Sequence, residues 1–463
     1  MSDRNLRNRG TARLSMGALA GVGLALAGCA SQQLQQTAQQ IDLMEQELSA
    51  QPPEPPADGA VLGPSELLAS AEGAGKDFMR ARINRARAML ELDKVKSARL
   101  PRISAEARQI ATYTGDDLGD VAGTSNIVLG VNWDISKALL RLDQPSVEVA
   151  GRLIPVQYQI AQRTATSNLL NTYNEYTTLD FRHKNAVLKE KGLACRAGDV
   201  GEDVASGDAT ARELKALKAQ VAAARHEADA VSRLLASKRD ELLGLAGLAE
   251  GGYRVAPERS VLSSLSGFES IKSDDAEACF ASSGKKRLED LLVEASAAQL
   301  DLARQSRFTK LKTSIPSFMT QTGGLNLQFL VSYVLPLIDE GDALRMTQNA
   351  RLTLMETILS ARDNRRDFMN DFNALKLGIA AAESDLAAAN AALVRAENQL
   401  QNADEAAHCG ESVDVEKAKT SVAAAKFKID MLKSRLLLLC APLSEKTSDD
   451  TGAAALAGMR SGK

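Results

Sequence analysis

Residues 342–408 form the longest uniform stretch of this chain, with no proline and a single glycine, Gly378. The stretch is dominated by residues such as Ala, Leu, Arg, Glu and Met, which favour helix because their side chains lose little rotamer freedom there. As one helix, at 1.5 Å per residue, it would extend roughly 100 Å. Helices of globular proteins usually stop at about 8–20 residues. The stretch therefore indicates a coiled coil, a helical repeat or a tube.

The parts that surround this stretch occur twice in the chain. Each half has a helix, a β-hairpin, a long helix and a returning helix, in the same order. The expected bounds in the first half are 65–98, 102–135, about 146–195 and 209–244. Those in the second half are 287–311, 314–335, 342–408 and 414–440. Because an internal repeat determines the fold as a whole, we predict a tandem repeat over 65–246 and 286–440, joined by a linker at 247–285.

The predicted hairpins have the length of membrane strands. Apolar and polar residues alternate from Asn126 to Ile135, and again from Leu325 to Leu335 after a Gly323-Gly324 turn, which is typical of half-buried strands. About ten residues suffice for a tilted strand to cross a bilayer. An open sheet edge in lipid costs several kcal/mol per unpaired group, so four strands would need partner copies: two copies supply eight, and three supply twelve around a lumen. The alternative is a pair of surface hairpins on a soluble coiled-coil protein.

The N-terminus carries the features of an export signal. A basic segment precedes a short apolar core from Met16 to Ala27, which is too short to span a bilayer. We predict a signal peptide at 1–28, then a lipid anchor with a Gln- and Pro-rich spacer at 29–64. Leu26-Ala27-Gly28-Cys29 resembles the bacterial lipobox, in which the cysteine is acylated, and Ala30 after it implies sorting to the outer membrane. An ordinary signal peptide with a chance cysteine is the alternative.

Several kinds of chemistry are not indicated by the sequence. The net charge of −3 argues against nucleic-acid binding as the main task. The three histidines, His183, His226 and His408, lack metal-ligand spacing, and no nucleophile elbow or His-Glu-x-x-His motif is present. Gly75-Lys76 lacks the rest of a phosphate-binding loop. We predict a protein that is not an enzyme and that binds no cofactor, metal or nucleic acid.

Several short segments carry a resemblance to a known family. They are Pro101 and Pro316 at the starts of outgoing strands, Val131-Asn132-Trp133-Asp134, Leu335-Pro336-Leu337-Ile338-Asp339-Glu340-Gly341, and the glycine-containing tips at Gly207 and Gly410. In this order and spacing, the chain resembles the TolC-like outer-membrane efflux proteins over most of residues 65–440. The resemblance implies a mainly α fold with a small membrane β-barrel. It also implies a homotrimer with twelve strands in the outer membrane and a helical tunnel into the periplasm.

The resemblance also implies roles for particular residues. Gly207 and Gly410 would lie at the tips that contact a periplasmic adaptor. Asp414 and, by weaker correspondence, Glu213 would ring the narrow entrance as an electrostatic gate that favours cations. Solvated charges on a coiled coil are the alternative for both carboxylates. The chain departs from the family where Pro155 should kink the first long helix.

The four cysteines that follow Cys29 allow three disulfide pairings. Cys195 and Cys409 both fall near the predicted tips, whereas Cys279 and Cys440 both fall near the linker. An exported protein resides in an oxidising compartment. We therefore favour the pairs Cys195–Cys409 and Cys279–Cys440. The tail at 441–463 is expected to be disordered.

The function implied by the resemblance is that of a passive conduit. The channel would receive substrate from an inner-membrane transporter through a periplasmic adaptor, in an efflux or type I secretion system, and would be held in outer-membrane lipid partly by the acylated Cys29. Small toxic molecules and a secreted polypeptide are both open as substrates. The alternatives are a structural or surface-attachment lipoprotein that uses the same tube, and a periplasmic adaptor protein.

Overall fold

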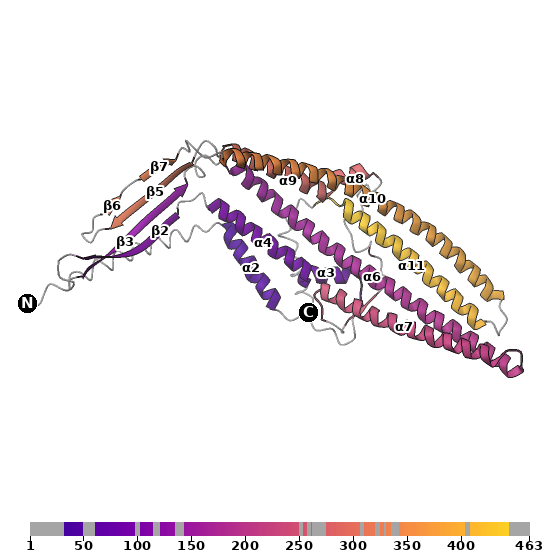
Figure 1. Cartoon of the computed structure of the whole chain (residues 1–463). Helices are drawn as coiled ribbons and strands as arrows, with labels where there is room; N and C mark the ends of the chain where they lie inside the picture. Colours follow the sequence, from indigo (N-terminus) through magenta and orange to yellow (C-terminus); the bar gives the residue numbers. More distant parts are fainter. Residues whose placement is uncertain are drawn as a thin grey trace, which may run out of the picture. The chain divides into compact units, whose positions relative to one another are not determined.

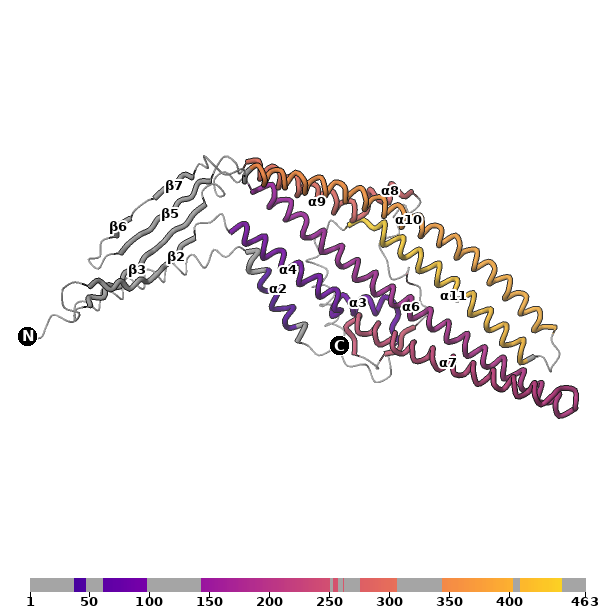
Figure 2. The backbone as a smooth tube through the Cα atoms, viewed as in Figure 1, coloured from indigo at the N-terminus to yellow at the C-terminus, as the bar shows by residue number. Residues whose placement is uncertain are grey.

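The computed structural model of this chain describes most of the predicted helices and strands. The described residues are 32–49, 61–97, 102–113, 121–134, 143–249, 253–256, 261, 275–305, 310–319, 325–327, 330–334, 342–402 and 408–443. The signal peptide, Cys29 and most of the predicted tail lie outside them. Figure 1 and Figure 2 follow the chain through its elements. Contacts divide it into one unit of 1–50, 83–148 and 305–340, and another of 51–82, 149–304 and 341–463.

The first unit contains an antiparallel sheet of five strands. The strands are β2 (Arg102–Tyr113), β3 (Val121–Asp134), β5 (Lys310–Met319), β6 (Leu325–Leu327) and β7 (Leu330–Val334). β2 pairs with β3 along its whole length, and β5 pairs with β3 on the other side. β6 and β7 both pair with β5. The two hairpins thus share one sheet, whose edges are β2 on one side and β6 and β7 on the other (Figure 1).

The predicted start of one strand was five residues too late. β3 starts at Val121, whereas alternation placed its start at Asn126. The ladder continues through Gln109 opposite Ser125 as far as Tyr113 opposite Val121. Backbone hydrogen bonds form this ladder, and they do not require the alternating side chains from which the strand was predicted. The Gly323-Gly324 turn lies outside the described residues.

The helices follow the predicted order, with some different bounds. They are α2 (Gln32–Ser49), α3 (Pro64–Ala74), α4 (Lys76–Ser97), α6 (Gln144–Ser206), α7 (Ala211–Leu245), α8 (Ala276–Ser282), α9 (Gly284–Gln305), α10 (Asp342–Asn402) and α11 (His408–Cys440). Two short strands, β1 (Val61–Leu62) and β4 (Arg254–Val255), pair in parallel. These bounds give each repeat its predicted long helix and returning helix.

Two predictions about the helices were wrong. The helix expected at 65–98 is broken at Gly75, whose backbone is extended, with φ −65° and ψ 135°. A Cβ there would lie 2.5 Å from the Ala71 carbonyl oxygen and 2.7 Å from that of Leu245, so only glycine suits the position. α6 runs to Ser206, about a dozen residues beyond its predicted end.

α6 continues through Pro155. Its neighbours Ile154 and Val156 are buried, and their burial offsets the backbone hydrogen bond that proline removes. The predicted kink at Pro155 stays a prediction.

In the second unit, α6 lies between α7 and α11. Lys189 and Lys238 of the α6–α7 pair reach carboxylates across the interface: Lys189 bonds Glu227 at 2.9 Å, and Lys238 bonds Glu175 at 2.8 Å. On the other side of α6, the Tyr173 ring meets Phe427 of α11 at a centroid distance of 6.0 Å. The returning helices of the two repeats, α7 and α11, are therefore neighbours of α6 on opposite sides (Figure 1).

α11 in turn lies between α6 and α10. Lys428 bonds Asp385 of α10 at 3.0 Å, and Lys433 lies 3.4 Å from Glu383. Gly378 of α10 lies beside Leu432, whose methyl carbons would be in ordinary contact with a Cβ there, at 3.5 Å and 3.6 Å. The order across this part of the unit is therefore α7, α6, α11, α10. α7 and α10 form its two edges.

The described residues of the segment predicted as a linker, 247–249, 253–256, 261 and 275–285, pack against the core. Tyr173 donates to the Ala256 carbonyl at 2.6 Å, and the Val261 amide donates to Asp430 at 2.6 Å. Val261 is fully buried. α8, also within the predicted linker, places Phe280 against Phe368 of α10 at a centroid distance of 5.0 Å. These contacts join the linker to helices of both repeats, which its mixed composition did not indicate.

α7 ends in a turn that only glycine suits. Gly247 has a positive φ of 71°, and the Leu248 amide donates to the Leu243 carbonyl at 2.9 Å, as in a Schellman motif. A Cβ on Gly247 would also lie 2.6 Å from the backbone of Ala74. The end of α7 is thus packed directly on the end of α3.

We predict opposite effects for two alanine substitutions at this turn. Gly247→Ala should destabilise the fold by about 1–3 kcal/mol from the left-handed backbone alone, and by more because the Cβ meets the Ala74 backbone. Gly244→Ala, three residues earlier in α7 with open space around it, should be neutral or stabilise by up to about 1 kcal/mol. Thermal unfolding followed by circular dichroism measures both. Equal losses would contradict the assignment.

Candidate functional site

The free ends of the two helical hairpins are where the sequence predicted partner contacts. Between α6 and α7, Gly207 has a φ of 93°. The Asp208 amide donates to the Asp203 carbonyl at 2.8 Å, which is the six-residue bond of a Schellman motif. The Ser206 hydroxyl also reaches Asp208 at 2.8 Å. The first tip is therefore a tight, hydrogen-bonded turn, with Gly207 at the predicted position.

Glu213 caps the returning helix at this tip. Its carboxylate accepts from the Thr210 amide at 3.0 Å and from the Thr210 hydroxyl at 2.9 Å, while its own amide donates to that hydroxyl at 3.3 Å. These reciprocal bonds form a capping box. The backbone bond from Thr210, followed by the side-chain bond, lowers the pKa of Glu213 below its ordinary value. Glu213, one of the two gate candidates, therefore stabilises the start of α7 through these bonds.

The second tip differs from the prediction. The break was expected around Cys409–Ser412, but α11 already begins at His408, so these residues are helical. α10 ends at Asn402, and residues 403–407 lie outside the described part. Gly410 therefore lies in the first turn of α11 and not between the two helices. Asp414, the other gate candidate, is exposed and bonds Lys417 at 2.9 Å.

The four cysteines form the two pairs that their placement favoured. Cys279 of α8 is joined to Cys440 at the end of α11, with their Cα atoms 4.8 Å apart, and both side chains are fully buried. Cys195 of α6 is joined to Cys409 of α11, with Cα atoms 6.0 Å apart. In this second pair Cys195 is half-buried and Cys409 is exposed. One bond therefore lies in the core, and the other lies at the surface near the tips.

Residues just after Cys440 continue the packing, contrary to the predicted tail. Leu443 is buried against Val156 and Leu291. Arg163 of α6 donates to the Ala441 carbonyl at 2.6 Å. Disorder was predicted from 441 onwards because the composition turns polar and small there, but these first residues cover the side of α6. Residues 444–463 lie outside the described part.

α10 exposes a long apolar stripe. Its members are Leu344, Leu352, Met355, Ile358, Leu359, Leu377 and Val394, all exposed by at least a third. At 100° per residue they share an arc of about 120°. Five of them lie within 344–359, and Leu377 and Val394 extend the set to roughly 75 Å, with Arg362, Arg366 and Asn373 on the same arc between Leu359 and Leu377. Phe368, Phe372 and Ile379 point to a different side, where they pack in the cluster that includes Cys440 of α11. The stripe therefore faces away from the helical partner of α10.

Composition alone would also let part of α10 cross a membrane. The segment Leu344–Asn402 contains a stretch of sufficient length and apolarity, of which 11% is buried in the chain. In the same helix, Glu383 and Asp385 pair with Lys433 and Lys428 of α11. Ion pairs of this kind on the surface of a helix favour an aqueous setting for this part of α10.

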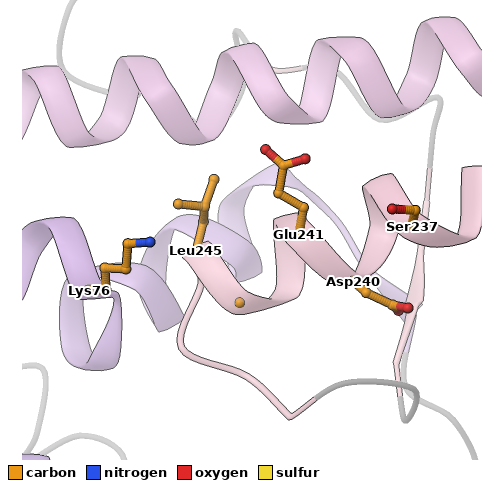
Figure 3. A pocket seen from close by; sticks show the side chains of 6 residues that line it. Lys76, Ser237, Asp240, Glu241 and Leu245 are labelled. Atoms are coloured by element: carbon orange, nitrogen blue, oxygen red, sulfur yellow. The ribbon is translucent and has the colours of Figure 1, made fainter. Parts of the chain in front are cut away.

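An open cavity lies where α4 meets the end of α7. It has a volume of about 720 Å³ and is lined by Lys76, Ser237, Asp240, Glu241, Gly244 and Leu245 (Figure 3). Glu241 is bonded to Lys238 at 2.7 Å, and Asp240 to Arg239 at 3.0 Å. Both carboxylates thus have partners on their own helix. Among the described residues, no group of three or more His, Cys, Asp or Glu side chains is arranged to hold a metal ion.

Solved structures of outer membrane proteins share this fold. VceC of Vibrio cholerae has a TM-score of 0.59 at 13% identity, and the match covers 82% of this chain and 97% of VceC. The Campylobacter jejuni outer membrane channel CmeC has a TM-score of 0.61 at 14% identity, covering 85% and 89%. The open state of the Neisseria gonorrhoeae MtrE outer membrane channel has a TM-score of 0.57 at 16% identity, covering 86% and 95%. No family model matches the chain, and neither does any curated protein.

These likenesses confirm the predicted resemblance to TolC-like outer-membrane efflux proteins at the level of the fold. They cover 89–97% of each of these solved chains and 82–86% of this one. The mainly α fold is thereby confirmed. The capped first tip and the apolar stripe are features of this chain's own residues.

The capping box makes the first tip sensitive to acid. Because hydrogen bonds lower the pKa of Glu213, its ionised form stabilises the folded tip. This contribution is complete above the ordinary value of 4.5 and is lost as the pH falls and the carboxylate becomes protonated. We predict that amides at the start of α7 lose hydrogen-exchange protection over this range, and that Glu213→Gln removes the pH dependence. Glu202→Gln on α6 is the control and should leave it intact. A Glu213→Gln profile equal to that of the unaltered protein would contradict the cap.

Proposed function

We propose that this protein is the outer-membrane channel of an efflux or type I secretion system and works as a homotrimer. The observation that supports this most strongly is the apolar stripe of α10. Burying seven large apolar side chains removes enough area from water to favour association by several kcal/mol. A stripe this large is typical of a surface that another protein covers.

The order of the helices supports a ring of identical copies. α7 and α10 are different surfaces at opposite edges, so one copy's α10 would meet the next copy's α7. Such head-to-tail contacts generate closed rings when the rotation closes. The sheet has the same property, because its edges are formed by β2 and by β6 with β7. β6 and β7 pair with successive parts of β5 and so count as one strand position, which gives four positions per copy. Three copies would close twelve strands around a lumen, leaving no open edge in lipid.

The remaining parts of the proposal rest on the resemblance that the sequence carries. The strands would cross the outer membrane, and an acyl group on Cys29 would add a second attachment to its lipid. The helical tips, with Gly207 in the turn, would extend into the periplasm and meet an adaptor that joins the channel to an inner-membrane transporter. Because Gly410 lies in α11, it would contact the adaptor from the side of the second tip. The channel itself would be passive and would carry out no catalysis.

Two glutamates on the apolar stripe should prevent assembly. Leu352→Glu with Leu359→Glu would place charges in the proposed interface, where burial without partners is costly. We predict monomers in detergent and no conductance in planar bilayers, whereas the unaltered protein gives trimers that conduct. Asn349→Glu, an exposed position of α10 off the stripe, is the matched control and should remain trimeric. Trimers from the double variant would contradict the interface. Trimers of the unaltered protein that never conduct would favour a structural lipoprotein.

Asp414 provides a separate test of the gate. A ring of carboxylates at a narrow entrance favours cations. We predict that Asp414→Asn with Glu213→Gln lowers the cation-to-anion permeability ratio of the channel. Glu416→Gln, which lies about 200° around α11 from Asp414 and is bonded to Lys419, should leave that ratio unchanged. Equal ratios in all three proteins would mean that Asp414 and Glu213 are solvated surface charges.

A further inference from the structure

The surface disulfide Cys195–Cys409 joins the two helical hairpins close to their free ends. Cys195 belongs to α6 of the first repeat, and Cys409 to the first turn of α11 in the second. The bond spans 214 residues of sequence. The other disulfide, Cys279–Cys440, ties α8 to α11 at the far end of the hairpin from the tips. Cys195–Cys409 is therefore the covalent link between the two repeats at the tips.

Cys195 lies nine residues beyond Ala186, the last buried residue of α6. Next to it, Gly192 lies against Val413, with a Cβ position 3.3 Å from a Val413 methyl, and Val413 is 1% exposed. Beyond Cys195, none of the α6 residues up to Ser206 is buried in the described structure. Without the disulfide, the ends of α6 and α11 would be held together only by Val413 and its neighbours. With it, their Cα atoms stay 6.0 Å apart.

The two disulfides also differ in access to solvent. Both sulfurs of Cys279–Cys440 belong to fully buried residues, so a reductant must wait for the core to open. Cys409 is exposed and Cys195 is half-buried, so a thiolate can approach the bond in the folded protein. Exposed disulfides are the ones that exchange readily with dithiols.

We propose that Cys195–Cys409 is a redox-sensitive clasp that sets how far the two hairpin tips can separate. A dithiol would attack one of its sulfurs to form a mixed disulfide, releasing the other cysteine as a thiolate. The second thiol of the reductant then displaces the first cysteine. Two electrons pass to the protein, the reductant leaves as a disulfide, and the two cysteines end as thiols. Reoxidation by a disulfide reverses the exchange.

The position of the clasp suits a control of tip movement. It lies on the α6–α11 seam inside one copy, and not at the α7 or α10 edges that the proposed ring would cover. Oxidised, the two hairpins of a copy move as one body at their tips. Reduced, each hairpin end can move by itself. The consequence for conductance rests on the proposed channel function, whereas the motion of the tips does not.

Hydrogen exchange on the purified full-length protein tests the clasp directly. Dithiothreitol is added under native conditions, and thiols are counted by mass after maleimide labelling. We expect two labelled thiols, at Cys195 and Cys409, and four only after denaturation. Amides of 195–206 and 408–415 should then exchange about tenfold faster, while the rest of α6 and α11 is unchanged. Labelling of all four thiols together, or of none, overturns the proposal.

Two variants separate the clasp from a general loss of stability. Cys195→Ser with Cys409→Ser should reproduce the faster tip exchange without reductant and should not respond to dithiothreitol. Cys279→Ser with Cys440→Ser should keep the reductant response at the tips. If this second variant fails to fold, Gly198→Ala, an exposed helical position close to the clasp, replaces it and should retain the response. Unchanged tip exchange in the first variant refutes the clasp whether or not the protein conducts.

Conductance then shows whether the clasp acts on the channel. In planar bilayers, dithiothreitol should raise the open probability of the unaltered protein about twofold or more, and Cys195→Ser with Cys409→Ser should show the raised value from the start. A protein that conducts with no response to reductant, in spite of faster tip exchange, overturns the control of conductance. Absence of conductance in every variant counts against the proposed function, and the exchange result stands apart from it.

Discussion

The packing of α6 against α11 is the contact on which the rest of this structure depends. It joins the first repeat to the second through the meeting of Tyr173 with Phe427 and through the surface disulfide near the tips. Because α6 also holds α7, and α11 also holds α10, this one seam sets the order of the helices. As a result, α7 and α10 form two different edges of the chain. An edge that carries a long apolar stripe needs a partner, and the unlike edge of an identical copy can provide one.

The sheet also has two different uncovered edges, and there the uncovered groups are backbone amides and carbonyls. β2 and the β6–β7 side each leave one row of backbone groups without a strand. In water such a row can be solvated, but in lipid it cannot. Under the proposed function, the helical edges and the strand edges would both be covered by repetition of the chain around an axis. Both kinds of edge come from a single duplicated pattern of helix, hairpin and long helix.

Much of this arrangement could be predicted from the sequence. The errors concern features that depend on backbone conformation or on partners distant in sequence. The duplication, the pairing of strands and the cysteine pairs follow from periodicity and placement. Helix ends were less predictable, because Gly198, Gly201, Gly207 and Gly410 look alike in sequence, and only Gly207 adopts a positive φ. The core contacts of Val261 and α8 depend on partners far away in sequence. The stripe of α10 was present in the spacing of Leu352, Met355 and Leu359, but helix propensity alone does not tell which side is covered.

Electron cryo-microscopy of the protein in lipid nanodiscs tests the central claim most directly, because it shows which helix meets which across the boundary between copies. The account predicts a closed ring of three copies in which α10 of each lies along α7 of the next, with their strands continuous through the bilayer. Single copies with α10 facing water, or two-fold pairs in which α10 meets α10, would contradict it.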